Sequence, residues 1–332
     1  MNMSYLLKPL ETDKLALKNR LIMPPMATSK SREDGKVSED ILKYYDEKSK
    51  GGYISLIIIE HSFIAQAGKA SKKQLSISDD GLVEGLKRLS EIIHRNGSKT
   101  IMQINHAGSA ASRSITGAEV VGPSAVANPI KGDMPKELTC MEIENIVKQF
   151  EEAAIRVKRA GFDGVEIHSA HGYFLNQFFS PLTNKRTDEY GGNVKARIKI
   201  HLDIIRAIRE SVGDDFPIFL RLGASDYMPG GSTVEDSKIA ALEFEKAGVD
   251  VLDISGGFCR YTLPGNTSQG YFSPLTEEIK KVISIPVILT GGITEVQAAE
   301  TLLSENKADL IGVGRAVYRD SSWAKKAVES LE

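Results

Sequence analysis

The chain has 332 residues, and its 42 Lys and Arg residues against 44 Asp and Glu residues give a formal net charge of −2. Hydrophobic residues make up 41% of the chain and charged residues 26%, which is typical of a globular protein. Because there is no basic excess, we expect no nucleic-acid and no membrane partner, and we expect a small-molecule substrate.

Eight short apolar runs, rich in β-branched residues, predict strands that are covered on both faces, as in a parallel sheet. In chain order they are Leu21–Met26, Ile54–Ile59, Lys99–Asn105, Gly164–His168, Ile218–Leu222, Val251–Ser255, Pro286–Thr290 and Leu310–Gly314. Amphipathic patterns between and after them predict helices over 39–50, 81–96, 142–160, 194–212, 234–247, 276–283, 294–305 and 322–331. Ser38 has the character of an N-cap for the first of these helices.

Eight strands, each followed by a helix, predict an α/β protein with the (β/α)8 TIM barrel fold. A doubly wound sheet is the alternative, but it has no obvious use for eight parallel strands in a chain of this size. No polar linker divides the chain, so residues 1–332 are predicted to form a single domain. The connections over 107–141 and 168–193 are unusually long, and both belong to the carboxyl-end face of such a barrel, where active sites are built.

The start of the chain, its apolar segments and its cysteines indicate the cellular compartment in which we expect the protein. The start, MNMSYLLKPLETDKL, lacks the basic stretch and long apolar run of a signal peptide, and no apolar segment is long enough to cross a bilayer. Cys140 and Cys259 are the only cysteines, which is too few for a four-cysteine metal or iron–sulfur site. We therefore expect a cytoplasmic protein.

Two glycine-bearing segments, LTGGIT (289–294) and GVGRA (312–316), follow the seventh and eighth predicted strands. Many barrels bind phosphate at these two positions. Gly291 and Gly292 let backbone N–H groups approach an anion closely, and Arg315 adds a bidentate charge. The glycines could instead serve only tight strand-to-helix turns, but two such strand ends, one with an arginine, favour a ligand with a phosphate group.

Two polar side chains occupy otherwise apolar strands. Arg221 is costly to bury in the fifth strand without an acceptor. It could pair with an internal acid such as Glu166 or Asp253, or it could stabilise negative charge on a bound ring or oxyanion. Gln103 ends the third strand, and its amide can both donate to and accept from a ligand edge, or it could satisfy polar groups of the barrel rim.

The segment HSAHGY (168–173) places two imidazoles and a phenol at the end of the fourth strand. A zinc site would need further ligands; HExxH is absent, and only an acid from another strand end could complete the site. A metal-dependent barrel hydrolase or lyase that uses His168 and His171 is therefore the rival function. Rim histidines bonded to backbone are the structural alternative. Without a metal, His168, His171 and Tyr173 can polarise a carbonyl oxygen and deliver a proton.

Seven segments, in order over nearly the whole chain, match one known family. They are KNRLIMPPMAT (18–28), QINHAG (103–108), VGPSA (121–125), AGFDGVEIHSAHGYFLNQFFSPLTNKRTDEYGG (160–192), LRLGASD (220–226), TGGIT (290–294) and GVGRA (312–316). With these segments the chain resembles the old yellow enzymes, which are FMN-dependent NADH:flavin oxidoreductases and ene-reductases with this barrel. The resemblance implies a noncovalent FMN across the carboxyl-end mouth.

The resemblance also implies roles for individual residues. The cofactor-binding residues would be Pro25, Met26, Ala27, Gln103, Arg221, Gly291, Gly292, Gly314 and Arg315. Gln103 would meet the pyrimidine edge of the flavin, and Arg221 would stabilise its anionic reduced form. The catalytic residues would be His168 and His171, which bind the carbonyl oxygen of an electron-poor alkene, and Tyr173, which gives a proton to its α-carbon. NADH or NADPH would be the reductant, and a flavin dehydrogenase without ene-reductase activity is the alternative.

Several positions depart from the family pattern. Ala27 replaces a threonine or cysteine that tunes the flavin, and Ser29 stands where one bacterial branch has a substrate-contacting tyrosine. His61 occupies a position beside the flavin that is usually held by a small residue, where either its ring packs near the flavin or only its backbone matters, and Ser109 replaces an arginine. The C-terminal AVESLE lacks the arginine-bearing tail that some relatives insert into a neighbour, so a homo-oligomer is compatible with the sequence but that architecture is not transferred. Larger relatives add an iron–sulfur cluster and a second domain; here we expect direct reduction by a nicotinamide or a separate electron donor.

Overall fold

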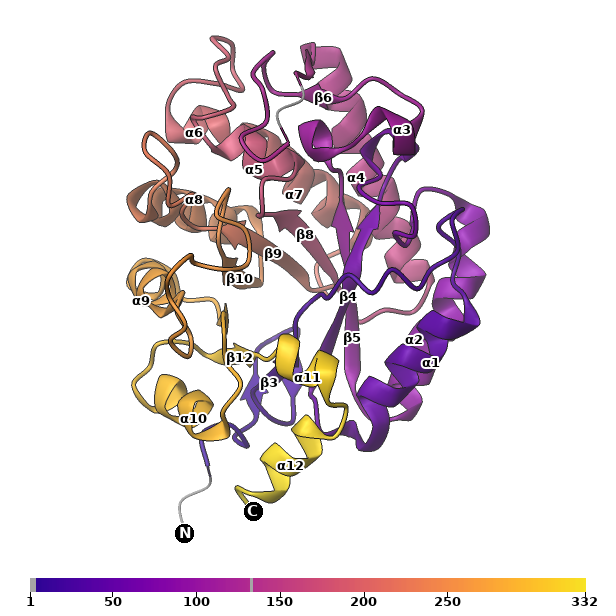
Figure 1. Ribbon diagram of the computed structural model, residues 1–332, viewed down its shortest axis with the longest axis vertical. Helices are drawn as coiled ribbons and strands as arrows, with labels where there is room; N and C mark the ends of the chain where they lie inside the picture. Colours follow the sequence, from indigo (N-terminus) through magenta and orange to yellow (C-terminus); the bar gives the residue numbers. More distant parts are fainter. Residues whose placement is uncertain (1–3, 132–133) are drawn as a thin grey trace.

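Eight parallel strands close into a barrel in the computed structural model, which describes residues 4–131 and 134–332 (Figure 1). Around the ring the strands are β3 (Leu21–Met23), β4 (Leu56–Phe63), β5 (Lys99–Asn105), β8 (Val165–Ser169), β9 (Ile218–Gly223), β10 (Val251–Ser255), β11 (Val287–Thr290) and β12 (Leu310–Gly312). The ring closes where Ile311 pairs with Leu21 and Gly312 with Ile22. The predicted TIM barrel is confirmed, and each predicted strand is present.

Helices cover the outside of the barrel (Figure 1). They are α1 (Glu39–Ser49), α2 (Val83–Arg95), α4 (Cys140–Arg159), α7 (Lys199–Val212), α8 (Val234–Ala247), α9 (Ser273–Lys280), α10 (Val296–Ser304) and α12 (Trp323–Glu329). Ser38 caps α1 as predicted, because its side chain accepts a hydrogen bond from the backbone N–H of Ile41. These helices bury one apolar face each against the strands, which forms the main core.

Some predicted helix boundaries were wrong. The prediction for 142–160 begins two residues too late, because Thr139 and Glu142 form a capping box that starts α4 at Cys140. The prediction for 194–212 joins two helices, α6 (Val194–Arg197) and α7, which a break at Ile198 separates. In place of the helix predicted over 276–283, α9 begins and ends three residues earlier, and a proline occupies its first turn.

The two long connections contain short elements that the sequence pattern does not predict. The first holds α3 (Arg113–Thr116) and the strand pair β6 (Val121–Gly122) and β7 (Lys136–Glu137), and the second holds α5 (Phe174–Phe179). Further short elements are the hairpin of β1 (Leu10–Glu11) and β2 (Ala16–Leu17) and the helix α11 (Arg315–Arg319). Each is too short to show a hydrophobic period.

The inside of the barrel is layered, since inward-facing residues recur every second position along a strand. One layer is apolar and packs against the β1–β2 hairpin; it contains Ile101, Phe219, Val251 and Ile288 among others. Two positions further along these strands the inward residues are polar: Gln103, Arg221, Asp253 and Thr290. The hairpin therefore covers the apolar end, and the polar layer lies toward the carboxyl ends of the strands. No helix among residues 4–131 and 134–332 is long and apolar enough to cross a membrane.

Candidate active site

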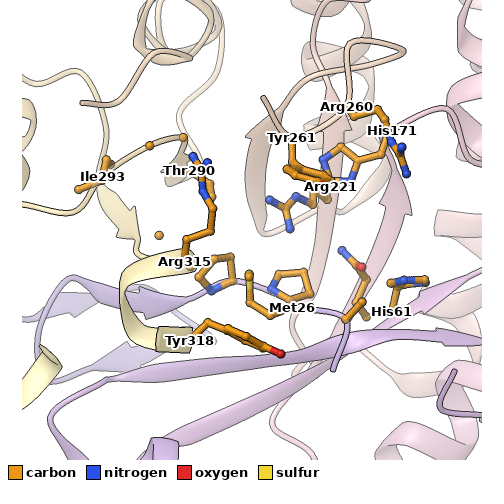
Figure 2. Close-up of a pocket in the computed structure, with 18 of the residues that line it drawn as sticks. Met26, His61, His171, Arg221, Arg260, Tyr261, Thr290, Ile293, Arg315 and Tyr318 are labelled. Atoms are coloured by element: carbon orange, nitrogen blue, oxygen red, sulfur yellow. The ribbon is translucent and has the colours of Figure 1, made fainter. Parts of the chain in front are cut away.

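A cavity of about 560 Å³ lies above the polar layer, at the carboxyl ends of the strands (Figure 2). This volume is within the usual range of small-molecule and cofactor sites. Every residue predicted for the site lines it: Pro25, Met26, Ala27, Gln103, His168, His171, Tyr173, Arg221, Gly291, Gly292, Gly314 and Arg315. The structure thus brings together residues from six strand ends, whereas the role of each remains a prediction.

Arg221 forms part of the floor of the cavity, and an acid lies beneath it. The Nε atom of Arg221 lies 3.3 Å from Oδ2 of Asp253, and Arg221 is only 4% exposed. Among the described residues, none accepts a hydrogen bond of good geometry from Arg221. The salt bridge and the ligand-facing cation that the sequence left as alternatives therefore occur together. An arginine this deeply buried has unused donors for an anionic ligand.

Gln103 lies beside this pair and is held by an acid. Its amide Nε2 donates to Oε1 of Glu166 at 2.7 Å, which leaves the second amide N–H and the amide oxygen without a partner in the described part of the chain. Burial raises the pKa of Glu166 well above its usual value, and the charge of Asp253 raises it further. Gln103 thus keeps the mixed donor and acceptor character that was predicted for it.

The side chains of the HSAHGY segment form one ring cluster in the cavity wall. The ring centroid of His168 lies 5.1 Å from that of His171 and 5.2 Å from that of Tyr173. Burial lowers the pKa of both histidines well below the usual value, and the charge of Arg221 lowers it further. Both imidazoles are therefore neutral at neutral pH. Burial raises the pKa of Tyr173, so its phenol keeps its proton.

His171 is fixed by its backbone and by a neighbouring strand. Its φ of 62° lies in the left-handed region, which costs energy for a residue with a side chain, so the surrounding structure must hold it there. Its N–H donates to the carbonyl oxygen of Gly256 at 3.2 Å, and its Nε2 lies 2.8 Å from Oγ of Ser255. His168 has no such partner: its Nδ1 is buried without a hydrogen bond to the described residues.

His61, near the end of β4, lines the cavity, in agreement with its family position beside the flavin, although it was not among the predicted catalytic and cofactor-binding residues. Its ring centroid lies 5.3 Å from that of Tyr173, and its Nδ1 contacts Nε2 of Gln74 at 2.8 Å. Burial lowers the pKa of His61 to about 4, so it too is neutral. Its place at a strand end was the available signal. Ser109, another departure, is buried and accepts a hydrogen bond from Asn128, away from the cavity lining.

The two glycine-bearing strand ends form the opposite wall. Gly292 has a φ of 69°, and a Cβ there would lie 2.6 Å from the ring of Tyr271, so only glycine fits without displacement. The backbone N–H groups of Gly292, Gly314 and Arg315 donate to no residue that the structure describes. Arg315 Nη2 donates to the hydroxyl of Tyr271 at 3.2 Å. Sequence reasoning missed Tyr271, because it lies in a loop without periodicity.

These observations fit a bound FMN. The free N–H groups and Arg315 suit a phosphate, and Arg221 with Gln103 suits a polar ring edge. Figure 2 shows Arg315 and His61 on opposite sides of the cavity. The metal hydrolase alternative finds no support: in residues 4–131 and 134–332 no group of three or more His, Cys, Asp or Glu side chains could hold a metal ion.

Comparisons with known proteins agree with this arrangement. The family model described as the NADH:flavin oxidoreductase / NADH oxidase family matches residues 5–332. The chain is 44% identical over 324 residues to an NADH oxidase of Thermoanaerobacter brockii, covering 96% of this chain and 50% of the relative. It is 38% identical to an NADPH dehydrogenase of Listeria monocytogenes serotype 4b over 99% of this chain and 96% of that protein.

A solved structure gives the same result for the fold. The old yellow enzyme homologue from Zymomonas mobilis superposes with a TM-score of 0.86 at 26% identity, covering 98% of this chain and 92% of that chain. The resemblance to the old yellow enzymes is thereby confirmed. The chain spans about half the length of the NADH oxidase from Thermoanaerobacter brockii.

Proposed function

Since the chain belongs to the NADH:flavin oxidoreductase / NADH oxidase family, we propose that it is an FMN-dependent NAD(P)H oxidoreductase that reduces the C=C bond of α,β-unsaturated carbonyl compounds. The observation that carries this proposal is the cluster of His168, His171 and Tyr173, which faces the same cavity as Arg221 and the two glycine-bearing strand ends. We also propose that residues 1–332 act as one FMN-binding domain.

The residues assigned to the cofactor would hold it by its two ends. Gly291, Gly292, Gly314 and Arg315 would bind the phosphate, and the backbone of residues 25–27 with Gln103 would contact the ring system. Arg221 supplies a buried cation for negative charge on the ring. When bound, FMN supplies hydride transfer, first from NADH or NADPH and then to the β-carbon of the alkene.

The chain's own residues would bind and polarise the substrate. His168 and His171 are neutral donors whose rings lie 5.1 Å apart, a spacing that allows both to donate to one carbonyl oxygen between them. Withdrawal of electron density at that oxygen makes the β-carbon a better hydride acceptor. Tyr173 keeps its proton because burial raises its pKa, and it would deliver that proton to the α-carbon.

Anaerobic reduction of the purified, FMN-loaded protein tests the proposal. We expect NADH or NADPH to bleach the flavin absorbance, and 2-cyclohexenone or maleimide to restore it with formation of the saturated product. His168→Ala and Tyr173→Phe should slow the second step by about 100-fold or more, the usual effect of losing a general acid or an oxyanion donor. His94→Gln, an exposed histidine outside the cavity, serves as the matched control.

Two results would contradict the proposal. Reduction by a nicotinamide without turnover of either alkene favours the flavin dehydrogenase alternative. Unchanged alkene turnover in both cavity variants would show that the roles of His168 and Tyr173 are wrong.

A further inference from the structure

The cavity lining carries four arginines, and no carboxylate of the described residues reaches it. The arginines are Arg221, Arg260, Arg315 and Arg319. The proposed FMN site accounts for two of them, Arg315 at the phosphate and Arg221 at the ring. Arg260 lies elsewhere: Figure 2 shows it grouped with Tyr261 and His171, across the cavity from Met26 and Tyr318. Its positive charge therefore needs a different explanation.

The backbone beneath Arg260 is rigidly held. Its φ of 66° is left-handed, and its N–H donates to the carbonyl oxygen of Gly257 at 2.9 Å. The buried residue Asp226 ties down the preceding turn: the N–H of Phe258 donates to its Oδ1 at 2.9 Å and that of Cys259 to its carbonyl oxygen at 3.1 Å. A Cβ at Gly257 would lie 2.2 Å from Oδ1 of Asp226, so the turn is packed without spare room. Arg260 is thus presented at a fixed place.

The side chain of Arg260 is an available cation. It is exposed, it forms no ion pair with the acids of residues 4–131 and 134–332, and its Cζ lies 5.8 Å from the ring centroid of Tyr261. Its charge reaches the groups assigned to the substrate. Burial is the main cause of the shifted pKa of both His171 and Tyr173, and Arg260 further lowers the pKa of His171 and opposes the rise for Tyr173.

We propose that Arg260 binds an anionic oxygen group, a carboxylate or a phosphate, on the molecule that lies beside His171 and Tyr173. A guanidinium group matches both groups through paired N–H bonds. The inference rests on the proposed function, because that function places a ligand there. The anion has two sources in this reaction: a carboxylate on the alkene, or the diphosphate of NADH or NADPH.

The first experiment compares 4-oxo-2-pentenoate with its neutral methyl ester. Their dissociation constants are measured on the oxidised, FMN-loaded protein without reductant, so the measurement does not require turnover. We expect Arg260→Ala to weaken binding of the carboxylate by about tenfold, the lower range for a charge-assisted hydrogen bond at an exposed site, and binding of the ester by less than about twofold. Arg260→Lys should retain part of the preference for the carboxylate. The ratio of the two dissociation constants in each variant, divided by the same ratio in wild type, cancels any difference in intrinsic affinity between the carboxylate and its ester.

The second experiment compares NADH with 1-benzyl-1,4-dihydronicotinamide, a hydride donor without phosphates, in anaerobic flavin reduction. If Arg260→Ala leaves the dissociation constants of the carboxylate and its ester unchanged, but slows flavin reduction by NADH about tenfold and not reduction by the phosphate-free donor, the anion is the phosphate of the reductant. Arg206→Ala, which removes one exposed arginine from α7, controls for net charge.

The outcomes separate this inference from the proposed function. The inference is overturned if Arg260→Ala changes neither the carboxylate-to-ester affinity ratio nor the ratio of the two flavin reduction rates more than Arg206→Ala does. If the carboxylate binds through Arg260 but neither it nor 2-cyclohexenone nor maleimide is reduced, the inference holds and the proposed alkene reduction fails.

Discussion

Glu60, on β4, is a buried acid that gives the stability of this protein a defined pH dependence. It is 2% exposed, and its Oε2 accepts a hydrogen bond from the backbone N–H of Thr28, just behind the cavity wall. Burial raises its pKa from 4.5 to about 7, although the hydrogen bonds from Thr28 and the charge of Lys30 act in the opposite direction. Between these two values the folded protein holds a proton that the unfolded chain has released.

The sign and size of the effect follow from that difference. An acid with a raised pKa in the folded state makes the protein less stable as the pH rises from about 4.5 to about 7. A rise of about 2.5 pKa units corresponds to about 3 kcal/mol of unfolding free energy, lost gradually over that window. Glu60→Gln keeps an acceptor for the N–H of Thr28 but has no proton to lose. The variant should therefore lack this part of the pH dependence.

Urea unfolding of the FMN-loaded protein, measured near about pH 5 and near about pH 8, provides the assay. Between these conditions wild type should lose about 2 to 3 kcal/mol relative to Glu60→Gln. Glu84→Gln, which changes an exposed acid on α2, should leave the pH dependence as in wild type. The reasoning is refuted if the difference between wild type and Glu60→Gln is the same at both pH values.

Three further changes have expected effects on cofactor retention and stability. Gly292→Ala places a Cβ 2.6 Å from the ring of Tyr271 at a residue whose φ is 69°. The affinity for FMN, measured by flavin fluorescence, should therefore fall by about tenfold or more. An unchanged affinity would count against the glycine turn as the phosphate site. Thr139→Ala removes the capping box with Glu142 and should lower the free energy of unfolding, measured in urea, by about 1 kcal/mol. An unchanged free energy of unfolding would mean that the cap does not stabilise α4. The carboxylate of Asp226 accepts hydrogen bonds from three N–H and O–H groups, and Asp226→Asn leaves at least one of these buried donors without an acceptor. The free energy of unfolding should therefore fall by about 2 kcal/mol. An unchanged free energy of unfolding would argue that the turn does not depend on the carboxylate.

The strands and the two polar positions within them followed from one rule of sequence pattern, whereas residues 25–27 and Gly314 were assigned to the site only by the resemblance to the old yellow enzymes. A strand covered on both faces is continuously apolar, so a polar residue such as Gln103 or Arg221 in it signals the barrel interior. The structure confirms that both side chains face the cavity. Arg221 also shows the limit, since sequence position did not reveal that it both pairs with Asp253 and keeps free donors.

Loop residues were beyond prediction for a physical reason. Arg260 and Tyr271 reach the cavity from the connection after β10, and their positions depend on contacts with distant residues such as Asp226 and Arg315. Such contacts leave no hydrophobic period in the sequence. The left-handed conformation of His171 is a similar case, because neighbouring backbone groups, not its own residue type, impose it.

The pairing of β12 with β3, which closes the barrel, has a consequence for synthesis of the protein. β3 and β12 pair directly, and Gly314 lies so close to Met26 that a Cβ there would be 2.9 Å from its Sδ. Two neighbouring parts of the cavity wall, residues 25–27 after β3 and residues 312–315 at the end of β12, are therefore translated early and last, respectively. A nascent chain on the ribosome has no complete cavity until residues 310–315 have emerged and paired. Capture of FMN thus reports that translation of the barrel is finished, and chains truncated before β12 should remain colourless.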